Sequence, residues 1–497
     1  MEWMQLKFGE WLPDQPDFEN SGATVATNCY AGATSYKPIK SIEAYSDEIG
    51  LAGGDFIRGA VSCKDATNTA RVYAGDAGNM YRLSAQSFDA IATGFTGTAT
   101  QNVWNFANYG PERLLATNFM NAIQKIVHGT SIGALGGSPP RAKYIQTVRD
   151  FVVLGWINDG TDRPNRVQWS GYNDSEFWEA GDIARQSDYQ DIYEGGWITG
   201  LAETGGSCLV IQEEAVTLMQ YVGPPLIFSF TRIANSVGSR TPRSIITHSD
   251  RVWWWGTNEI WEFSGGQIKP IAGEKVADFW ANDYDASYPE RVSVGIDRTH
   301  KLVIWSYPSN TATGGLPNRL LIYAWDTGRW TKAEVTGDTI FHHLSAGKTL
   351  EEMDEISDDV DTSTWTLSFD HSIWKGGDIS QGIFKNKKMH LFSGSPMAAT
   401  IDTPEFKAPT GKTIEVMGAK PLHEGGDAQL SIGTRSVQSE SATYTTNTSV
   451  NRFGEVNLRK SGKFVRGRMH LQGSWSQAIG LELQVRGAAT RKRSADG

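Results

Sequence analysis

Short apolar segments alternate with turn residues along most of the chain, from about residue 51 to about residue 335. The apolar segments are four to eight residues long, and Gly, Asn, Asp or Pro residues separate them. This pattern is typical of β-strands joined by tight turns. One example is the predicted hairpin of segments 70–74 and 80–83, with Asp76-Ala77-Gly78-Asn79 as its turn.

The predicted strands fall into sets of three or four, and each set spans roughly 40–50 residues, the period that a β-propeller blade requires. Six sets lie between residues 51 and 335. A seventh blade would be closed by segments 388–392 and 399–403, or by a strand from the N-terminal segment. The sequence therefore predicts an all-β protein with a β-propeller of six or seven blades. A stack of β-sandwiches is the alternative, which the short hairpins disfavour.

The segments outside the repeats have different textures. Residues 1–50 are turn-rich without a helical period, which predicts an extended N-terminal arm, and Trp3, Phe8 and Trp11 argue against full disorder. From about residue 411, five segments alternate apolar and polar residues with period two, which predicts a small antiparallel β domain. These segments are 413–417, 429–432, 455–458, 467–472 and 480–485.

Two helices are expected. Residues 274–281 place Val276, Phe279 and Trp280 on one face, and residues 349–356 are a second candidate. The predicted division of the chain is an extended arm (1–50), a β-propeller (51–338), an irregular acidic insertion with closing strands (339–410), and a small antiparallel β domain with a basic tail at 491–493 (411–497).

Composition agrees with this fold and restricts the function. The chain has 53 Gly, 18 Trp, 16 Tyr and 20 Phe, and the Gly residues are spread among apolar segments rather than clustered in linkers. The net charge of −10 and the pI of about 5.5 argue against a protein that grips nucleic acid, since that requires a basic face. A channel through which DNA slides is compatible with this charge, because an acidic lumen repels phosphate.

Neither a disulfide framework nor a membrane span is expected. The three cysteines, Cys29, Cys63 and Cys208, are far apart and odd in number. No apolar run approaches the roughly 18–20 residues that a span needs. Residues 1–5 lack the basic and apolar regions of a signal peptide, so synthesis in the cytoplasm is expected.

The search for catalytic or metal-binding residues yields no candidate. The segment 326–331 partly resembles an Asp box of sialidase-type propellers, but a simple β-turn explains it. His342 and His343 are adjacent, so on a strand they point to opposite faces and cannot share a metal easily. No GxSxG, HExxH or P-loop motif is present. The sequence therefore predicts no enzyme, no cofactor and no metal site.

Two other features have competing interpretations. The run Trp253-Trp254-Trp255 is interpreted as a buried core or interface strand, with a sugar-binding platform as the alternative. The acidic run at 351–361 lacks the spacing of an EF-hand loop, so a solvated loop is expected, with a metal site or a DNA-repelling rim as alternatives.

A series of segments in the middle of the chain is similar to a known family. Residues 166–178 contain the order R-V-x-W-S, then N-D, then W. This order resembles the tail nozzle proteins, also called packaged-DNA stabilisation or tail-hub proteins, of short-tailed bacteriophages (podoviruses). The further matching segments are 195–201, 210–216, 221–225, 237–238, 242–245, 261–266, 270–271 and 274–276, with 462–468 and 480–482 near the C-terminus.

The resemblance implies a structural role in the virion. Members of this family form a propeller with added β domains and assemble as a homo-oligomeric ring, typically a hexamer, beneath the portal and adaptor rings. The channel of the ring carries the genomic DNA, and its wall or tip holds fibre, spike or needle proteins. The expected location is the phage tail, assembled in the host cytoplasm. Residues 339–388, with the Gly376-Gly377 pair as a hinge, are the first candidate for a gate.

Two other functions remain open from the sequence. A receptor- or glycan-binding tail propeller would expose Trp253 or Trp255 in a groove. A glycan-degrading propeller would carry paired carboxylates in a cleft.

Overall fold

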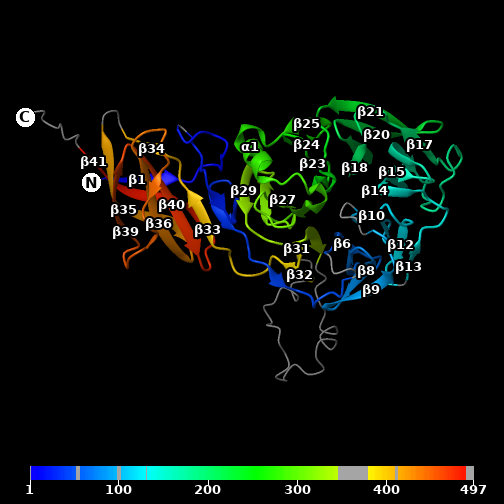
Figure 1. Cartoon of the computed structure of the whole chain (residues 1–497), viewed down its shortest axis with the longest axis horizontal. Helices are drawn as coiled ribbons and strands as arrows, with labels where there is room; N and C mark the ends of the chain where they lie inside the picture. Colours follow the sequence, from blue (N-terminus) through cyan, green and yellow to red (C-terminus); the bar gives the residue numbers. More distant parts are fainter. Residues whose placement is uncertain are drawn as a thin grey trace, which may run out of the picture.

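The larger lobe of the molecule is a β-propeller (Figure 1). The computed structural model describes residues 2–18, 20–51, 56–97, 102–129, 131–344, 379–408 and 412–488. Within these residues, seven groups of four antiparallel strands surround one axis, and the first strand of each group lies innermost. The predicted all-β propeller is confirmed, and its blades number seven.

The first four blades follow one another without interruption by other elements. Blade 1 consists of β6 (Gly59–Lys64), β7 (Ala70–Gly75), β8 (Asn79–Ser84) and β9 (Ser87–Thr93). Blade 2 consists of β10 (Asn105–Tyr109), β11 (Arg113–Thr117), β12 (Gln124–Val127) and β13 (Ser131–Ala134). Blade 3 consists of β14 (Arg141–Val148), β15 (Phe151–Asn158), β16 (Asp162–Trp169) and β17 (Asp188–Asp191). Blade 4 consists of β18 (Ile198–Thr204), β19 (Ser207–Gln212), β20 (Ala215–Gly223) and β21 (Ile227–Asn235).

The last three blades include the short helices. Blade 5 consists of β22 (Ile246–His248), β23 (Arg251–Trp255), β24 (Ile260–Ser264) and β25 (Gln267–Pro270). Blade 6 consists of β26 (Ser293–Asp297), β27 (Leu302–Tyr307), β28 (Arg319–Ala324) and β29 (Arg329–Ala333). Blade 7 contains β30 (Thr339–Leu344), β31 (Ile379–Lys385) and β32 (Lys388–Leu391). Single 3₁₀ turns, η1 (Pro242–Ser244) and η2 (Pro289–Arg291), precede blades 5 and 6.

The N-terminal arm closes the propeller. Its strand β5 (Glu43–Ala44) pairs with β32 through His390↔Ala44 and Leu391↔Glu43, and so forms the outer strand of blade 7. Of the two closures considered from the sequence, the structure therefore has the one that uses the arm. Segment 399–403 lies in the other lobe, because β33 (Ala399–Asp402) pairs with a strand of the C-terminal region.

The smaller lobe is a two-sheet β-sandwich whose sheets face each other across a shared core. The first sheet contains β1 (Glu2–Lys7), β3 (Cys29–Ala31), β4 (Tyr36–Pro38), β35 (Thr413–Glu424), β39 (Val456–Gly462) and β41 (Gln477–Ala488). The second contains β2 (Ala26–Thr27), β33, β34 (Phe406–Lys407), β36 (Asp427–Arg435), β37 (Thr443–Tyr444), β38 (Thr448–Ser449) and β40 (Phe464–Gln472). All five C-terminal segments predicted as strands lie in these sheets.

One sheet is common to both lobes. The two-residue strand β2 pairs in parallel with β29 of blade 6 through Thr27↔Lys332, and antiparallel with β33 through Ala26↔Ile401 and Thr27↔Thr400. Blade 6 therefore continues into the sandwich as an 11-stranded sheet. The division of the chain differs from the expected one in two ways. The arm is distributed between the sandwich and blade 7 instead of forming a segment of its own. The propeller extends beyond the predicted boundary at residue 338, because blade 7 uses strands as far as residue 391, and the strands at 399–402 and 406–407 belong to the sandwich.

Asn28 holds this junction from both sides. Its backbone N–H donates to the carbonyl of Lys332 (2.8 Å), and its Oδ1 accepts from the N–H of Glu334 (2.8 Å). Its Nδ2 donates to the carbonyl of Ala398 (2.9 Å), on the sandwich side. The residue has a φ of +62°, a left-handed conformation that asparagine tolerates better than most side chains.

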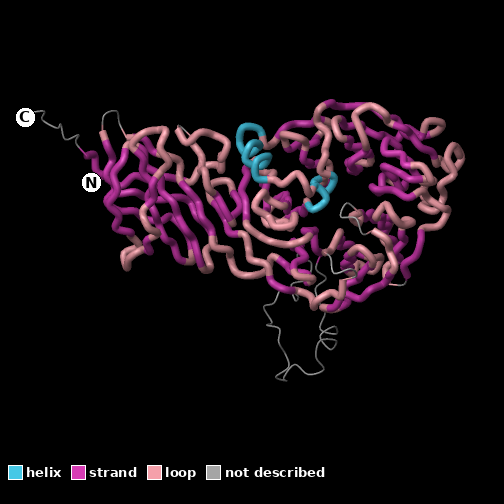
Figure 2. Tube along the Cα trace, viewed as in Figure 1, coloured by secondary structure: helices cyan, strands magenta, loops and turns pink. Residues whose placement is uncertain are grey.

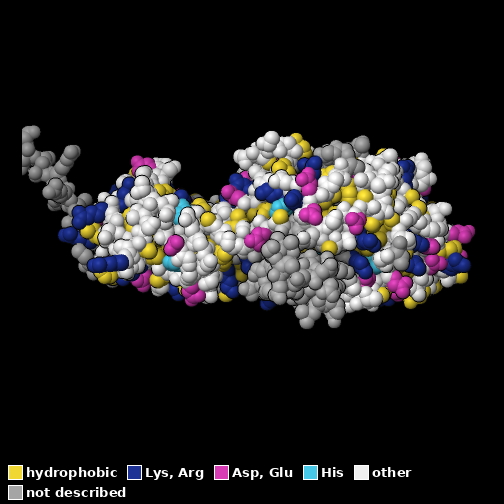
Figure 3. Space-filling model, turned by 90° about the horizontal axis from the view of Figure 1, so that it is seen from below, with side chains coloured by type: hydrophobic (Ala, Val, Ile, Leu, Met, Phe, Trp, Pro, Cys, Tyr) yellow, Lys and Arg dark blue, Asp and Glu magenta, His cyan; other side chains and the backbone are white. Residues whose placement is uncertain are grey.

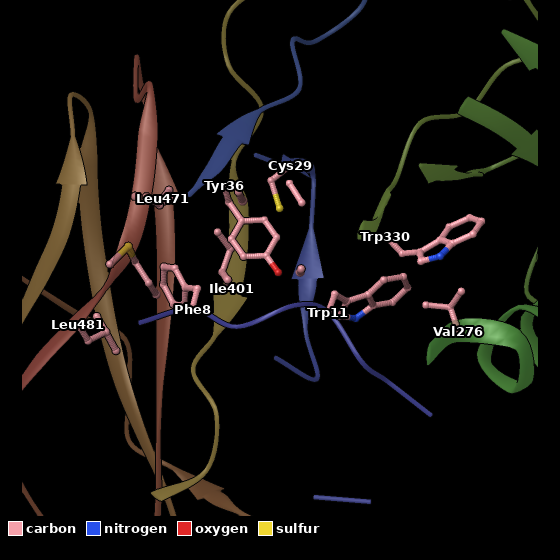
Figure 4. Packing of buried hydrophobic residues seen from close by; sticks show 14 of the residues in the cluster. Phe8, Trp11, Cys29, Tyr36, Val276, Trp330, Ile401, Leu471 and Leu481 are labelled. Carbon is pink, nitrogen blue, oxygen red and sulfur yellow. The ribbon is translucent and has the colours of Figure 1, made fainter. Parts of the chain in front are cut away.

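The core also crosses the junction. One cluster of buried side chains extends from the sandwich through the arm to blades 5 and 6. Figure 4 shows Trp11 of the arm between Ile401 on the sandwich side and Val276 and Trp330 on the propeller side. Trp11 and Trp330 are completely or almost completely buried. The two lobes are therefore packed as one hydrophobic unit.

The helix α1 (Gly273–Asp283) lies beside this core, and Figure 2 shows how little of the described chain is helical. The helix predicted at 274–281 is confirmed, with Val276 and Trp280 buried. The carboxylate of Glu259 accepts the N–H groups of Ala272 (2.9 Å) and Gly273 (3.0 Å), which satisfies donors at the start of the helix. No helix in the described residues has the length and apolarity to cross a bilayer.

Replacement of Asn28 tests how much its hydrogen bonds between the two lobes contribute to stability. We expect Asn28→Gly, which tolerates the positive φ, to lower the free energy of unfolding by about 1–2 kcal/mol, because two side-chain hydrogen bonds are lost. Asn28→Ala should cost about 1 kcal/mol more, since alanine adds strain at this φ. Urea unfolding of the full chain gives these values.

The matched control is Asn68→Gly. Asn68 also has a positive φ (+66°), but it lies in the exposed β6–β7 turn. We expect its replacement to change the free energy of unfolding by less than about 0.5 kcal/mol. Equal effects of the two glycine variants would contradict the bridging role of Asn28.

Candidate functional site

A cavity of about 470 Å³ lies where the arm, blades 6 and 7 and the sandwich meet. Its lining includes Tyr30 and Lys37 from the arm, His300 from blade 6, Gln381 from blade 7 and Trp475 from the sandwich. Cavities between lobes are common places for ligands in proteins. No segment of the sequence indicated this cavity, because its lining comes from four regions that only the fold brings together.

Polar groups of the cavity are partly paired with each other. His300 Nδ1 lies 2.7 Å from Asp297 Oδ2, and the His300 ring lies 5.1 Å from that of Tyr30. Burial and the nearby charge of Asp297 raise the pKa of Tyr30 to about 12, so its hydroxyl stays protonated at neutral pH. The Gln381 amide donates to the carbonyl of Ile296, and its Oε1 has no hydrogen-bond partner. The cavity therefore offers hydrogen-bonding groups and no evident nucleophile–base pair among its described residues.

The three consecutive tryptophans belong to the core. Trp253, Trp254 and Trp255 on β23 are all fully buried. Trp253 and Trp255 join the core that crosses the junction, whereas Trp254 faces the opposite side of the sheet and donates its indole N–H to the carbonyl of Val237 (2.7 Å). The interpretation as a buried strand is confirmed. The glycan-binding alternative predicted that Trp253 or Trp255 is exposed in a groove. This prediction is wrong, because both rings are buried in the core between sheets.

The segment that partly resembles an Asp box is a turn between two strands of blade 6. Residues 325–328 connect β28 to β29, and the Gly328 N–H donates to the carbonyl of Ala324 (2.8 Å). Gly328 has a φ of +67°, which explains the glycine at this position. The β-turn interpretation is confirmed.

The adjacent histidines point to opposite faces of β30, as predicted. His342 Nδ1 lies 3.2 Å from the carbonyl oxygen of Ile296, towards blade 6. His343 is 2% exposed, packs 5.7 Å from the Tyr45 ring, and has no partner at either ring nitrogen. Among the described residues, no three His, Cys, Asp or Glu side chains form a group that could hold a metal ion.

The three cysteines are free and buried. Cys63 Sγ lies 3.8 Å from His128 Nε2, and the other ring nitrogen of His128 lies 3.0 Å from the Tyr73 hydroxyl. Burial raises the pKa of the Cys63 thiol to about 12, with the charge of Asp65 adding to the effect. The thiol is therefore protonated at neutral pH, unlike the thiolate that acts as a nucleophile.

Several features singled out in the sequence lie outside the described residues. These are the acidic run at 351–361, the helix expected at 349–356, the Gly376-Gly377 pair with most of the candidate gate at 339–388, and the basic tail at 491–493.

Charged side chains of both signs are interspersed over the face of the molecule shown in Figure 3. Basic and acidic groups alternate along the propeller lobe in this view, with hydrophobic side chains between them. The described residues on this face therefore form no continuous basic stripe of the kind that a protein gripping nucleic acid presents.

Acid should destabilise the protein through His343. Burial lowers its pKa from 6.5 to about 4, with repulsion from His342 as the smaller cause. The unfolded chain then binds a proton at this residue between pH 6.5 and 4 that the folded chain does not bind. The stability contribution of neutral His343 is thus complete above pH 6.5 and is lost as pH falls towards 4. We expect His343→Phe to flatten the decline of unfolding free energy over this range.

The control for this measurement is His300→Gln, at a histidine whose side chain is 47% exposed. Urea unfolding at pH 7, 6, 5 and 4.5 for the wild type and both variants separates the effects. Identical pH profiles for the wild type and His343→Phe would show that buried His343 does not contribute to acid sensitivity.

Comparison with known proteins gives structural similarity only. No family model matches the chain, and no curated protein matches it. Two similar structures are extracellular domains from B. thetaiotaomicron, one described as part of a hybrid two-component system and one as part of a one-component system. Both are 8% identical to this chain, with TM-scores of 0.44 and 0.42 and coverage of 93% and 90% of it.

The WD40 β-propeller domain of Doa1 is also similar, at 8% identity and a TM-score of 0.36, over 71% of this chain and 96% of that domain. This chain covers 61% and 62% of the two bacterial domains, less than two thirds of their length. At these TM-scores the similarities carry no argument about function.

Proposed function

We propose that this chain is a structural component of a phage tail: a ring-forming nozzle below the portal and adaptor that forms the exit channel for DNA. The observation that carries the proposal is the sheet shared by blade 6 and the sandwich through β2. It joins a propeller and an added β domain, the combination implied by the sequence resemblance, into one body.

Such a body suits a ring that retains pressurised DNA. The propeller leaves only short strand edges, and the sandwich shares both a sheet and a core with it. Rotation between the lobes would break the pairing of β2 and expose the buried side chains around Trp11. A stiff protomer of this kind can close into a ring through head-to-tail contacts, because the angle between neighbours is fixed.

The charge of the chain supports transit of DNA rather than retention by contact. The net charge is −10, and the face in Figure 3 mixes both signs. Such a surface has weak non-specific affinity for phosphate, so DNA would slide past it. Anchoring of the ring would then rely on protein partners, namely the adaptor or portal proteins on one side and fibre, spike or needle proteins on the other.

Electron microscopy tests this proposal. We expect negative-stain images of the purified chain, alone or added to particles from the source lysate, to show rings with a central hole or density at the tips of short tails. The number of subunits, six by the resemblance, follows from class averages. A monomer at all concentrations that is also absent from the particles would overturn the proposal.

A further inference from the structure

Three aromatic side chains form a cluster on one end face of the propeller. The Trp156 ring lies 5.2 Å from the Trp197 ring at an interplanar angle of 67°, and 6.3 Å from the Phe119 ring. Phe119 follows β11, Trp156 lies near the end of β15, and Trp197 directly precedes β18. Since successive strands of a blade run in opposite directions, the second strands end on the same face on which the first strands begin. Blades 2, 3 and 4 thus each contribute one ring.

Trp197 is the exposed member of this cluster. Its exposed fraction is 51%, and among the described tryptophans only Trp3, at 38%, is also classed as exposed. Trp156 is partly buried, and its ring meets that of Trp197 at a steep angle. We call the surface between these two indole rings the Trp156–Trp197 corner. Together the two rings leave apolar area in contact with water, and a ligand with a complementary apolar face would remove that area from water on binding.

The loop that presents Trp197 is fixed before any ligand arrives. Gly195 and Gly196 have φ values of +100° and +84°, and a Cβ on Gly196 would lie 2.6 Å from Glu213 Oε2. The Asn165 side chain donates to the carbonyl of Gly196 (2.8 Å), and the Trp197 N–H donates to Glu213 Oε2 (3.1 Å). These bonds hold the loop without covering the indole, so binding would cost little ordering entropy.

Trp156 is held in a strained conformation beside it. Its φ is +50°, at a β-bulge between Gly155 and Ile157, and Phe119 has a φ of +67°. A left-handed conformation costs a non-glycine residue about 1–2 kcal/mol, and such strain concentrates at binding sites. The indole N–H donates to Asp162 Oδ1 (2.8 Å), and Lys143 Nζ lies 4.0 Å from the ring centroid. The orientation of the ring is therefore fixed by polar neighbours.

The groups around the corner define the ligand. The carboxylates of Asp162 and Glu213 bond to the two tryptophan residues, and Glu194 is exposed in the same loop as Trp197. Arg232 forms an ion pair with Glu194 (2.7 Å), and Lys143 lies over the Trp156 ring, so positive charge offsets part of this negative charge. The corner therefore has no basic excess that would attract phosphate or another anion. Its charged groups also distinguish it from the centre of a protein–protein interface, which is depleted of charged residues. A sugar ring offers a face of C–H groups to an indole and a rim of hydroxyls to carboxylates and to Lys143.

We infer that the Trp156–Trp197 corner binds a neutral carbohydrate. The inference goes beyond the nozzle function and does not depend on it. It assigns the glycan contact to blades 3 and 4, and not to the buried tryptophans of β23.

The test uses the purified full chain on an array of neutral oligosaccharides built from hexoses and N-acetylhexosamines, followed by calorimetric titration of the strongest binder. Trp197→Ala should weaken binding about tenfold or more, the loss typical of removing a central aromatic contact. Trp3→Ala, at the exposed tryptophan of the sandwich, is the matched control and should leave the affinity unchanged. Because Trp197 is half exposed, its truncation should leave the thermal unfolding midpoint close to that of the wild type.

Two results would overturn the inference: no binding of any oligosaccharide at millimolar concentration, or equal affinities of Trp197→Ala and Trp3→Ala. If Trp197→Ala abolished assembly of the oligomeric ring or binding to particles but left the affinity for oligosaccharides unchanged, the corner would be a contact with another protein instead. Imaging of the wild type and the same variants distinguishes the two proposals. If the protein forms no oligomeric rings but still binds an oligosaccharide, only the nozzle proposal is contradicted.

Discussion

The pairing of a two-residue strand, β2, with both lobes is the constraint on which the rest of the structure depends. Its backbone occupies the outer edge of blade 6 at Lys332 and the edge of the sandwich at Ile401. An edge strand left unpaired would present free N–H and C=O groups to any passing chain. By covering two such edges at once, β2 removes an aggregation hazard and fixes the position of one lobe against the other.

The remaining arm follows from this placement. Once Ala26 and Thr27 are seated, the residues before them reach the sandwich as β1, and those after them return to blade 7 as β5. Trp11 then fills the space between α1 and the sandwich, with its ring 5.0 Å from that of Phe279. A segment that looks irregular in the sequence thus supplies strands to three different sheets. Apart from the pairing of β3 with β4, its strands pair with strands that lie about 300 residues or more away.

The parts of the fold that could be predicted are those set by neighbouring residues. The turn at Asp76 was predictable because its Oδ1 accepts the N–H groups of Gly78 and Asn79, an interaction within four residues. The burial of Trp253–Trp255 followed from strand periodicity and size. In contrast, β2 and β5 are two residues long and carry no periodicity, and their partners lie more than 300 residues away.

The candidate sites were unpredictable for the same reason. Trp156 and Trp197 belong to different blades, and their surroundings are decided by a bulge and a glycine pair rather than by a motif. The cavity lining is assembled from four distant regions.

Closure of blade 7 by the arm has a consequence for the order of synthesis. Residues 43 and 44 are synthesised almost 350 residues before their partners, His390 and Leu391. At roughly 5–20 residues per second, the nascent arm waits on the order of 20–70 s without the strand it will pair with. The propeller cannot close before residue 391 has been made, so blade 7 is completed late in synthesis. Products of translation that stops before residue 391 would therefore lack a closed propeller.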